Sequence, residues 1–166
     1  NLKKGSGSQV AWNVRVASYD CGHENYGAMS PYNSPPCGPP IFGPTEVVSG
    51  SRQMGQISVT VGSSGDLNID GPKDCHVHAW TMGYLSSARS ISLARWGSWD
   101  VASLWIEDNF GIRGPFSHEA LANINFNAGW SIIHLVGYNQ NDDNFSMGIS
   151  SPLASLFDVM SPQMYS

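Results

Sequence analysis

Apolar residues recur at every second position in several short stretches of the chain. In residues 9–19 the side chains of Val10, Trp12, Val14 and Val16 fall on one face of an extended backbone. This period of two is typical of a strand that is buried on one side. The other predicted strands are 55–61, 66–70, 75–82, 90–94, 101–106, 121–127, 131–138 and 145–149. The pattern therefore predicts a chain built mainly of short β-strands.

Turn-forming residues separate these strands, and no stretch has the pattern of an amphipathic helix of three turns. Many short strands with Gly, Pro and Asn turns predict an all-β fold. We expect an antiparallel β-sandwich, with a jelly roll as the preferred topology. Helices are expected to be short at most, at 117–122 or 151–160, where Pro152 suits the first helical position.

The predicted strands leave two stretches outside the sheets. Residues 1–8, NLKKGSGS, are expected to be a flexible N-terminal arm. Residues 20–46 are rich in proline and glycine. Because proline has no backbone N–H to donate to a neighbouring strand, this stretch predicts a long loop. We expect residues 9–166 to form a single β-sandwich domain.

Charged residues are scarce in this chain. Asp, Glu, Lys and Arg make up 13% of the 166 residues, whereas ordinary domains have about a quarter. Ser, Asn, Gly and Gln take their place, and these residues can be buried at an interface without desolvating an ion. The net charge of −5 argues against a dedicated nucleic-acid-binding protein. No apolar run approaches the ~18 residues of a membrane span. We therefore expect a subunit of an assembly, covered by its neighbours.

The residues that carry chemistry form no recognisable catalytic motif. Cys21, Cys37 and Cys75 cannot all pair within one chain and include no CxxC. A bridge between the first two is one alternative, and free thiols in a reducing compartment are the one we favour. The chain has no G-x-S-x-G elbow. We expect no catalytic residues, no enzyme activity and no cofactor.

Histidines supply the weak candidates for a metal site. His76 and His78 are two apart, so a strand places both imidazoles on one face, and His134 lies in the middle of another predicted strand. Two histidines at this spacing occur in β-scaffold metal sites. No Glu follows His78 within the next several residues to complete such a set. We interpret the pair as structural or interfacial, facing solvent or a partner beside Trp80.

Tryptophans supply the candidates for a binding site. Trp96 and Trp99 lie in a predicted Gly/Ser turn, close to Arg95. Such loop aromatics are typical of a sugar-stacking platform or a protein anchor, and local packing is the equal alternative. Asp142 and Asp143 lie in an Asn-rich turn that could add polar contacts. Three other tryptophans are expected at inward strand positions: Trp12, Trp80 and Trp105.

The C-terminal third of the chain resembles a jelly-roll coat protein of picorna-like viruses, and is closest to the small coat protein of comovirus-type plant viruses. The residues that carry this resemblance are a β run at 101–106, the segment FGIRGPFS at 110–117, and the closing strands at 122–126 and 131–138. The loop PYNSPPCGPPIFGP at 31–44 is also similar to those that such coats display.

The resemblance implies a structural subunit of an icosahedral capsid, which self-assembles with other capsid protein chains around the genome. It implies a virion location, with host cytoplasm during assembly. Lateral contacts are expected through loops 20–46, 94–100 and 139–145. Residues 1–8 would face the interior, where Lys3 and Lys4 are expected to make weak contact with RNA.

Two other functions are consistent with the residues. The first is a carbohydrate-binding, lectin-like β-sandwich that uses Trp96, Trp99 and the turn at 139–144. The second is a metal-dependent enzyme built on His76, His78 and His134. These alternatives differ from a capsid subunit in requiring one defined ligand site.

Overall fold

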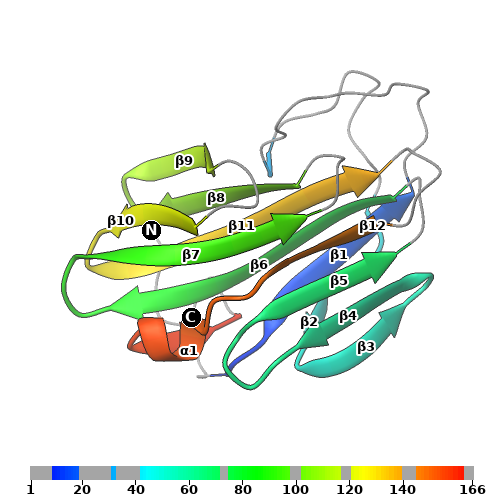
Figure 1. Ribbon diagram of the computed structural model, residues 1–166, viewed down its shortest axis with the longest axis horizontal. Helices are drawn as coiled ribbons and strands as arrows, with labels where there is room; N and C mark the ends of the chain where they lie inside the picture. Colours follow the sequence, from blue (N-terminus) through cyan, green and yellow to red (C-terminus); the bar gives the residue numbers. More distant parts are fainter. Residues whose placement is uncertain are drawn as a thin grey trace.

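Two antiparallel β-sheets packed face to face make up the described part of the protein (Figure 1). The structure is a computed structural model. It describes residues 9–18, 31–32, 42–71, 75–97, 102–116, 121–139 and 145–162. The predicted all-β antiparallel sandwich is therefore confirmed for these residues.

The first sheet has seven strands in the described residues, in the order β2-β1-β6-β11-β8-β9, with β13 also paired to β6. We call it sheet 1. Its strands are β1 (Trp12–Ser18), β2 (Glu46–Val48), β6 (Cys75–Leu85), β8 (Ala102–Asp108), β9 (Gly111–Phe116), β11 (Gly129–Asn139) and β13 (Val159–Ser161).

The second sheet has six strands in the described residues, in the order β10-β7-β12-β5-β4-β3. We call it sheet 2. Its strands are β3 (Gly50–Met54), β4 (Ile57–Val61), β5 (Leu67–Gly71), β7 (Arg89–Gly97), β10 (Leu121–Phe126) and β12 (Phe145–Ile149). One short helix, α1 (Leu153–Leu156), precedes β13.

Eight of these strands follow the winding of a jelly roll. β5 pairs with β12, β6 with β11, β7 with β10 and β8 with β9, and each pair is antiparallel. The chain therefore runs as a long double-stranded ladder that is closed by the β8–β9 turn. The first and third pairs belong to sheet 2, and the second and fourth belong to sheet 1. This alternation rolls the ladder into two sheets.

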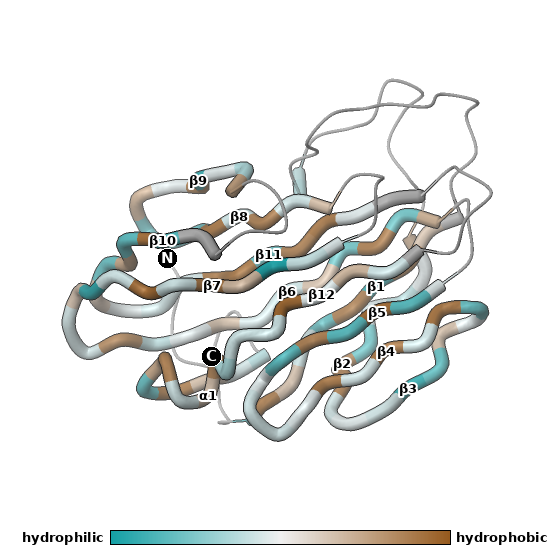
Figure 2. The backbone as a smooth tube through the Cα atoms, in the orientation of Figure 1, coloured by the Kyte–Doolittle hydropathy of each residue, from teal (hydrophilic) through white to brown (hydrophobic). Residues whose placement is uncertain are grey.

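The core lies between the sheets and is made by the alternating apolar positions. In β4 the burial pattern alternates strictly, with Ile57, Val59 and Val61 buried between exposed Ser58 and Thr60. Figure 2 shows apolar positions recurring along the strands of both sheets. Because side chains of a strand alternate between faces, a strand such as β4 contributes every second residue to this core.

One end of the core is closed by the C-terminal segment. Phe157 packs edge-to-face against Phe126, with ring centroids 5.2 Å apart. A Cβ atom at Gly83 would stand 2.6 Å from Cγ and 2.7 Å from Cε1 of Phe157. The missing side chain of this glycine on β6 therefore provides the space that the phenylalanine ring fills.

The strand pattern of β6 differs from that of β4, because both of its faces are buried. Val77 and Ala79 face the core, and His76 and His78 on the other face are also buried. Phe42 covers the outer face at His76, with ring centroids 5.3 Å apart. The histidine pair thus shares one face beside Trp80, as predicted; of the two expected surroundings, solvent is excluded by this burial, and a partner stays a prediction.

Several other sequence predictions need correction. Trp12 is fully buried and faces the core, but Trp80 and Trp105 lie on the outer face of sheet 1 and are half-buried. β7 extends to Gly97, so Trp96 lies in a strand and not in a turn. β2, β3, β9 and β13 were not predicted. Pro152 is the N-cap of α1 and not its first helical residue.

Membrane-spanning potential and cysteine burial can be stated for the described residues. In the described residues, no helix is long and apolar enough to cross a membrane. The described cysteine, Cys75, is buried. Cys21 and Cys37 lie outside the described residues, so their pairing stays a prediction.

Candidate functional site

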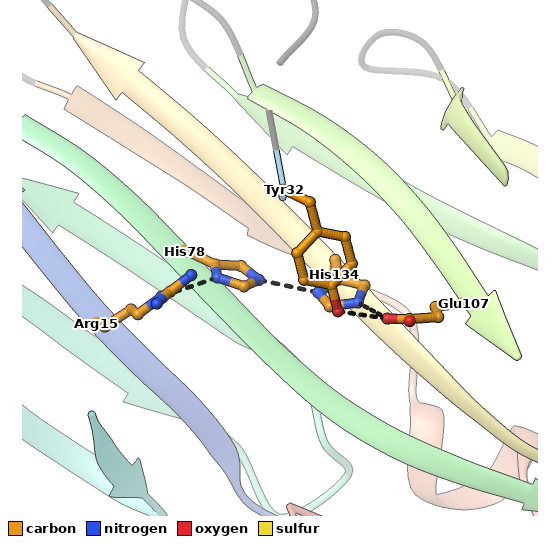
Figure 3. A network of polar contacts seen from close by, with 5 residues as sticks. All are labelled: Arg15, Tyr32, His78, Glu107 and His134. Atoms are coloured by element: carbon orange, nitrogen blue, oxygen red, sulfur yellow. Dashed lines mark hydrogen bonds and ion pairs between the residues drawn. The ribbon is translucent and has the colours of Figure 1, made fainter. Parts of the chain in front are cut away.

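A chain of hydrogen-bonded polar side chains crosses the outer face of sheet 1 (Figure 3). Its members are Arg15, His78, His134, Glu107 and Tyr32, and we call it the relay. Arg15 comes from β1, His78 from β6, His134 from β11 and Glu107 from β8, which are four neighbouring strands of the sheet. Tyr32 approaches from above the sheet (Figure 3). The relay therefore joins segments that are far apart in the sequence.

The strand register places these side chains on one face. Arg15 lies directly opposite His78, because β1 and β6 pair at that position. His134 lies opposite Trp80, two residues along β6 from His78, so the two imidazoles are diagonal neighbours. Diagonal neighbours on a sheet are within reach of long or aromatic side chains.

The hydrogen bonds fix the direction of the relay. Arg15 Nε donates to His78 Nδ1 at 3.0 Å, and an arginine has no atom that accepts. His78 must therefore carry its proton on Nε2, which lies 2.9 Å from His134 Nδ1. His134 in turn carries its proton on Nε2 and donates it to Glu107 Oε1 at 2.9 Å. Both imidazoles are thus neutral Nε2–H tautomers in this arrangement.

Glu107 is the acceptor at the end of the relay. The same Oε1 atom also accepts a hydrogen bond from the Tyr32 hydroxyl at 2.6 Å. These two hydrogen bonds lower the pKa of Glu107, with that from His134 the larger cause, while burial opposes the shift. A carboxylate at one end and a guanidinium at the other give the relay opposite charges at its two ends.

Aromatic contacts cover the relay. His78 is stacked between His134 and Trp80, with ring centroids 5.1 Å and 4.6 Å apart. Tyr32 meets the His134 ring edge-on at 5.6 Å. The Arg15 guanidinium lies 4.1 Å over the ring of Phe42, where it gains a cation–π interaction. His134 has no exposed surface as a result.

Burial lowers the pKa of His76 and of His78. Burial is the main cause that lowers the pKa of His76 to about 4, and the positive charge of Arg15 adds to it. Burial, then His134, Arg15 and His76, lower the pKa of His78 to about 2. Burial also lowers the pKa of Arg15, which the Tyr32 hydroxyl partly opposes. The charged form of each buried group is disfavoured because it loses its hydration.

The geometry suits hydrogen bonding better than metal binding. A tetrahedral zinc site needs each ring nitrogen about 2.0–2.1 Å from the metal, whereas the facing nitrogens of His78 and His134 are already joined to each other. In the described residues, no group of three or more His, Cys, Asp or Glu side chains could hold a metal ion. The relay is therefore an arrangement that holds protons in place across four strands.

The structure brings together two of the three histidines predicted from the sequence. His78 and His134 are in direct contact, whereas His76 lies beside them against Phe42. Arg15, Tyr32 and Glu107 were not predicted from the sequence. Arg15 had a signal, because it alternates with Val14 and Val16 and so points away from the core. Glu107 and Tyr32 had none, because their proximity depends on contacts distant in sequence.

The other predicted site residues are not brought together in the described part of the chain. Arg95 is 5% exposed and faces the interior, opposite Ile149, whereas Trp96 lies on the outer face of sheet 2. Trp96 covers Gly148, where a Cβ atom would stand 2.6 Å from its Cζ2 atom. Three further candidates lie outside the described residues: Trp99, Asp142 and Asp143.

Comparisons with known proteins find no match for this chain among protein-family models, curated proteins or solved structures.

Proposed function

We propose that the chain is a structural subunit of an icosahedral viral capsid, which self-assembles with other coat subunits around the genome. The observation that carries this proposal is the outer face of sheet 2. Besides Trp96, Ala94, Gly148 and the one ionisable residue, Asp70, its described outward strand positions are occupied by uncharged polar side chains. They are Ser51, Gln53, Ser58, Thr60, Asn68, Ser90, Ser92, Asn123, Asn125 and Ser146.

Such a face is suited to burial against another subunit. Exposed faces of soluble proteins normally carry Lys, Glu, Arg and Asp, which resist desolvation. Ser, Thr and Asn can form hydrogen bonds across an interface at a lower desolvation cost. The jelly-roll winding supports the proposal further, because it is the topology expected from the resemblance to picorna-like coat proteins. A shared fold does not by itself imply a shared function.

The proposal is tested by the assembly state of the native protein. Light scattering after size exclusion at moderate ionic strength, with negative-stain microscopy, should show particles or defined oligomers. The double variant Thr60→Glu, Asn68→Glu places two charges on the neutral face and should abolish them. The control Ser87→Glu adds a charge at an exposed bend and should assemble normally. A strictly monomeric protein that forms no particle with or without partner chains would exclude the proposal.

The N-terminal arm has its own place in this proposal. Lys3 and Lys4 would make weak contact with RNA on the interior side, although residues 1–8 lie outside the described residues. Removal of residues 1–8 should then reduce encapsidated RNA while the β-sandwich still folds. Unchanged RNA content in the truncated particles would contradict this part of the proposal.

A saccharide-binding function is the second candidate, and the position of Trp96 favours it. The indole is half-buried over Gly148. On the same face, Asn68 lies opposite Gly148, and Ser146, two residues along β12, donates its hydroxyl to Asp70 at 2.8 Å. Aromatic rings beside polar groups are able to stack on sugars and fix their orientation. A glycan array should show binding that is lost in Trp96→Ala and kept in Trp80→Phe. Absence of binding to every glycan would remove this candidate.

A further inference from the structure

The relay on sheet 1 holds a fixed number of protons. With both imidazoles neutral, it contains two ring protons, and each lies within a hydrogen bond to the next member. Both ring nitrogens of His78 and of His134 are in use. An additional ring proton must therefore replace an acceptor lone pair with a second donor.

The charged and titratable groups around the two rings come from every neighbouring element. His134 faces His78 on β6, Glu107 on β8 and Tyr32 above the sheet. His78 faces Arg15 on β1 and also interacts with His76 on its own strand. His134 thus has a carboxylate beside it, whereas His78 has a guanidinium. An added positive charge is stabilised far better on His134 than on His78.

We propose that the relay is a proton-operated latch on the outer face of sheet 1, and that its acid-sensitive step is protonation of His134 at Nδ1. The proton comes from solvent and binds the ring lone pair that accepts from His78 at neutral pH. The bond between His78 and His134 is lost, because two N–H groups then face each other. The bond from His134 Nε2 to Glu107 is retained and becomes an ion pair. This inference does not rest on the proposed capsid function.

The consequence falls on His78. After protonation of His134 it lies between an imidazolium and the Arg15 guanidinium, so its stacked position is no longer favourable. A change of tautomer does not restore the relay, because a proton on His78 Nδ1 would oppose Arg15 Nε. His78 therefore leaves its stack, and contacts between β6, β11 and β1 weaken on the outer face. The latch is closed at neutral pH and open in acid.

Ring nitrogen spectroscopy tests the proton positions directly. Long-range ¹H–¹⁵N spectra of the full chain at pH 7.5 should show Nε2–H tautomers at both His78 and His134. On acidification His134 should become an imidazolium while His78 is still neutral. An Nδ1–H tautomer at either residue in neutral solution, or charging of His78 before His134, would overturn the proposal.

Amide hydrogen exchange tests the opening. Amide protection factors in β6 and β11, corrected for intrinsic exchange rates, should fall about tenfold in the wild type over the pH range in which His134 becomes charged. We call this fall the step. The variant His134→Gln should not show it. The matched control His76→Gln removes a histidine of the same face that is not part of the relay, and should keep the step. The variant Glu107→Gln removes the carboxylate charge beside His134 and should move the step to lower pH. The proposal fails if the step persists in His134→Gln or, should that variant not fold, does not move in Glu107→Gln.

Discussion

The Nε atom of Arg15 lies 3.0 Å from the Nδ1 atom of His78, so a cation is bound directly to a buried neutral imidazole. Burial is the main cause of the lowered pKa of both His76 and His78, and the positive charge of Arg15 is a further cause for both. Replacing Arg15 with Met keeps much of the apolar stem and removes the charge. We expect the pKa of His76 to rise above about 4, measured by NMR titration of the ring. An unchanged pKa would show that burial alone causes the shift.

Acid should destabilise the protein below the ordinary histidine pKa of 6.5. The unfolded chain then binds protons at His76 and His78, whereas in the folded chain with the relay closed they stay neutral down to about pH 4 and about pH 2 respectively. Each such histidine lowers the free energy of unfolding by up to about 1.4 kcal/mol per pH unit in that window. Urea unfolding at pH 7.5, 6.5, 5.5 and 4.5 measures this slope.

The control for this pH dependence is a pair of single variants. His76→Gln and His78→Gln should each reduce the slope between pH 6.5 and 4.5, because each removes one group that protonates only on unfolding. Glu107 adds a loss of stability at lower pH, since its lowered pKa stabilises the fold above its ordinary value of 4.5. A slope that both histidine variants leave unchanged would contradict the neutral buried state.

Removal of the Glu107 carboxylate should cost more than removal of its charge. Glu107→Ala leaves the buried Nε2–H of His134 without its acceptor, which costs about 2 kcal/mol. Glu107→Gln keeps an acceptor oxygen and should cost about half as much. Tyr32→Phe removes one hydrogen bond from a residue that is 58% exposed, and should cost less than about 1 kcal/mol. Chemical denaturation at pH 7.5 measures all three; equal losses would contradict the relay.

Gly83 should not tolerate any side chain. A methyl group there would overlap the Phe157 ring, which closes one end of the core. Gly83→Ala should lower the free energy of unfolding by about 1–3 kcal/mol, as overpacked cores do. The control Gly43→Ala places its Cβ in ordinary contact, 3.5 Å from the Val16 carbonyl oxygen. Equal thermal stability of the two variants would show that Phe157 moves aside at little cost.

The alternation of apolar residues was sufficient to predict most of the strands, because they lie with one face in the core. β4 is the clearest case, with strict alternation of buried and exposed residues. β3 was missed for the opposite reason. Residues 50–53 are exposed on both faces at the edge of sheet 2 and only Met54 packs against the core, so burial imposed no alternating pattern on this strand.

The relay could be predicted from the sequence only in part. A period of two places His76 and His78 on one face, but does not say which face is the core when both are apolar. β6 is buried on both faces, so Trp80 was assigned to the wrong side. The contact between His78 and His134 depends on the register of β6 against β11, which is set by packing between distant segments.

The turn at Asn109 and Phe110 lies at the closed end of the ladder of paired strands, so cleavage of the chain there would separate the two sides of the ladder. Phe110 is 83% exposed there. Every described pairing of β9, β10, β11, β12 and β13 is with a strand that precedes this turn. A fragment beginning at Phe110 would thus have no sheet of its own among these strands. The N-terminal fragment retains the pairings of β1 with β2 and β6, and of β4 with β3 and β5, whereas the C-terminal fragment acquires its β-structure only by combining with the N-terminal one.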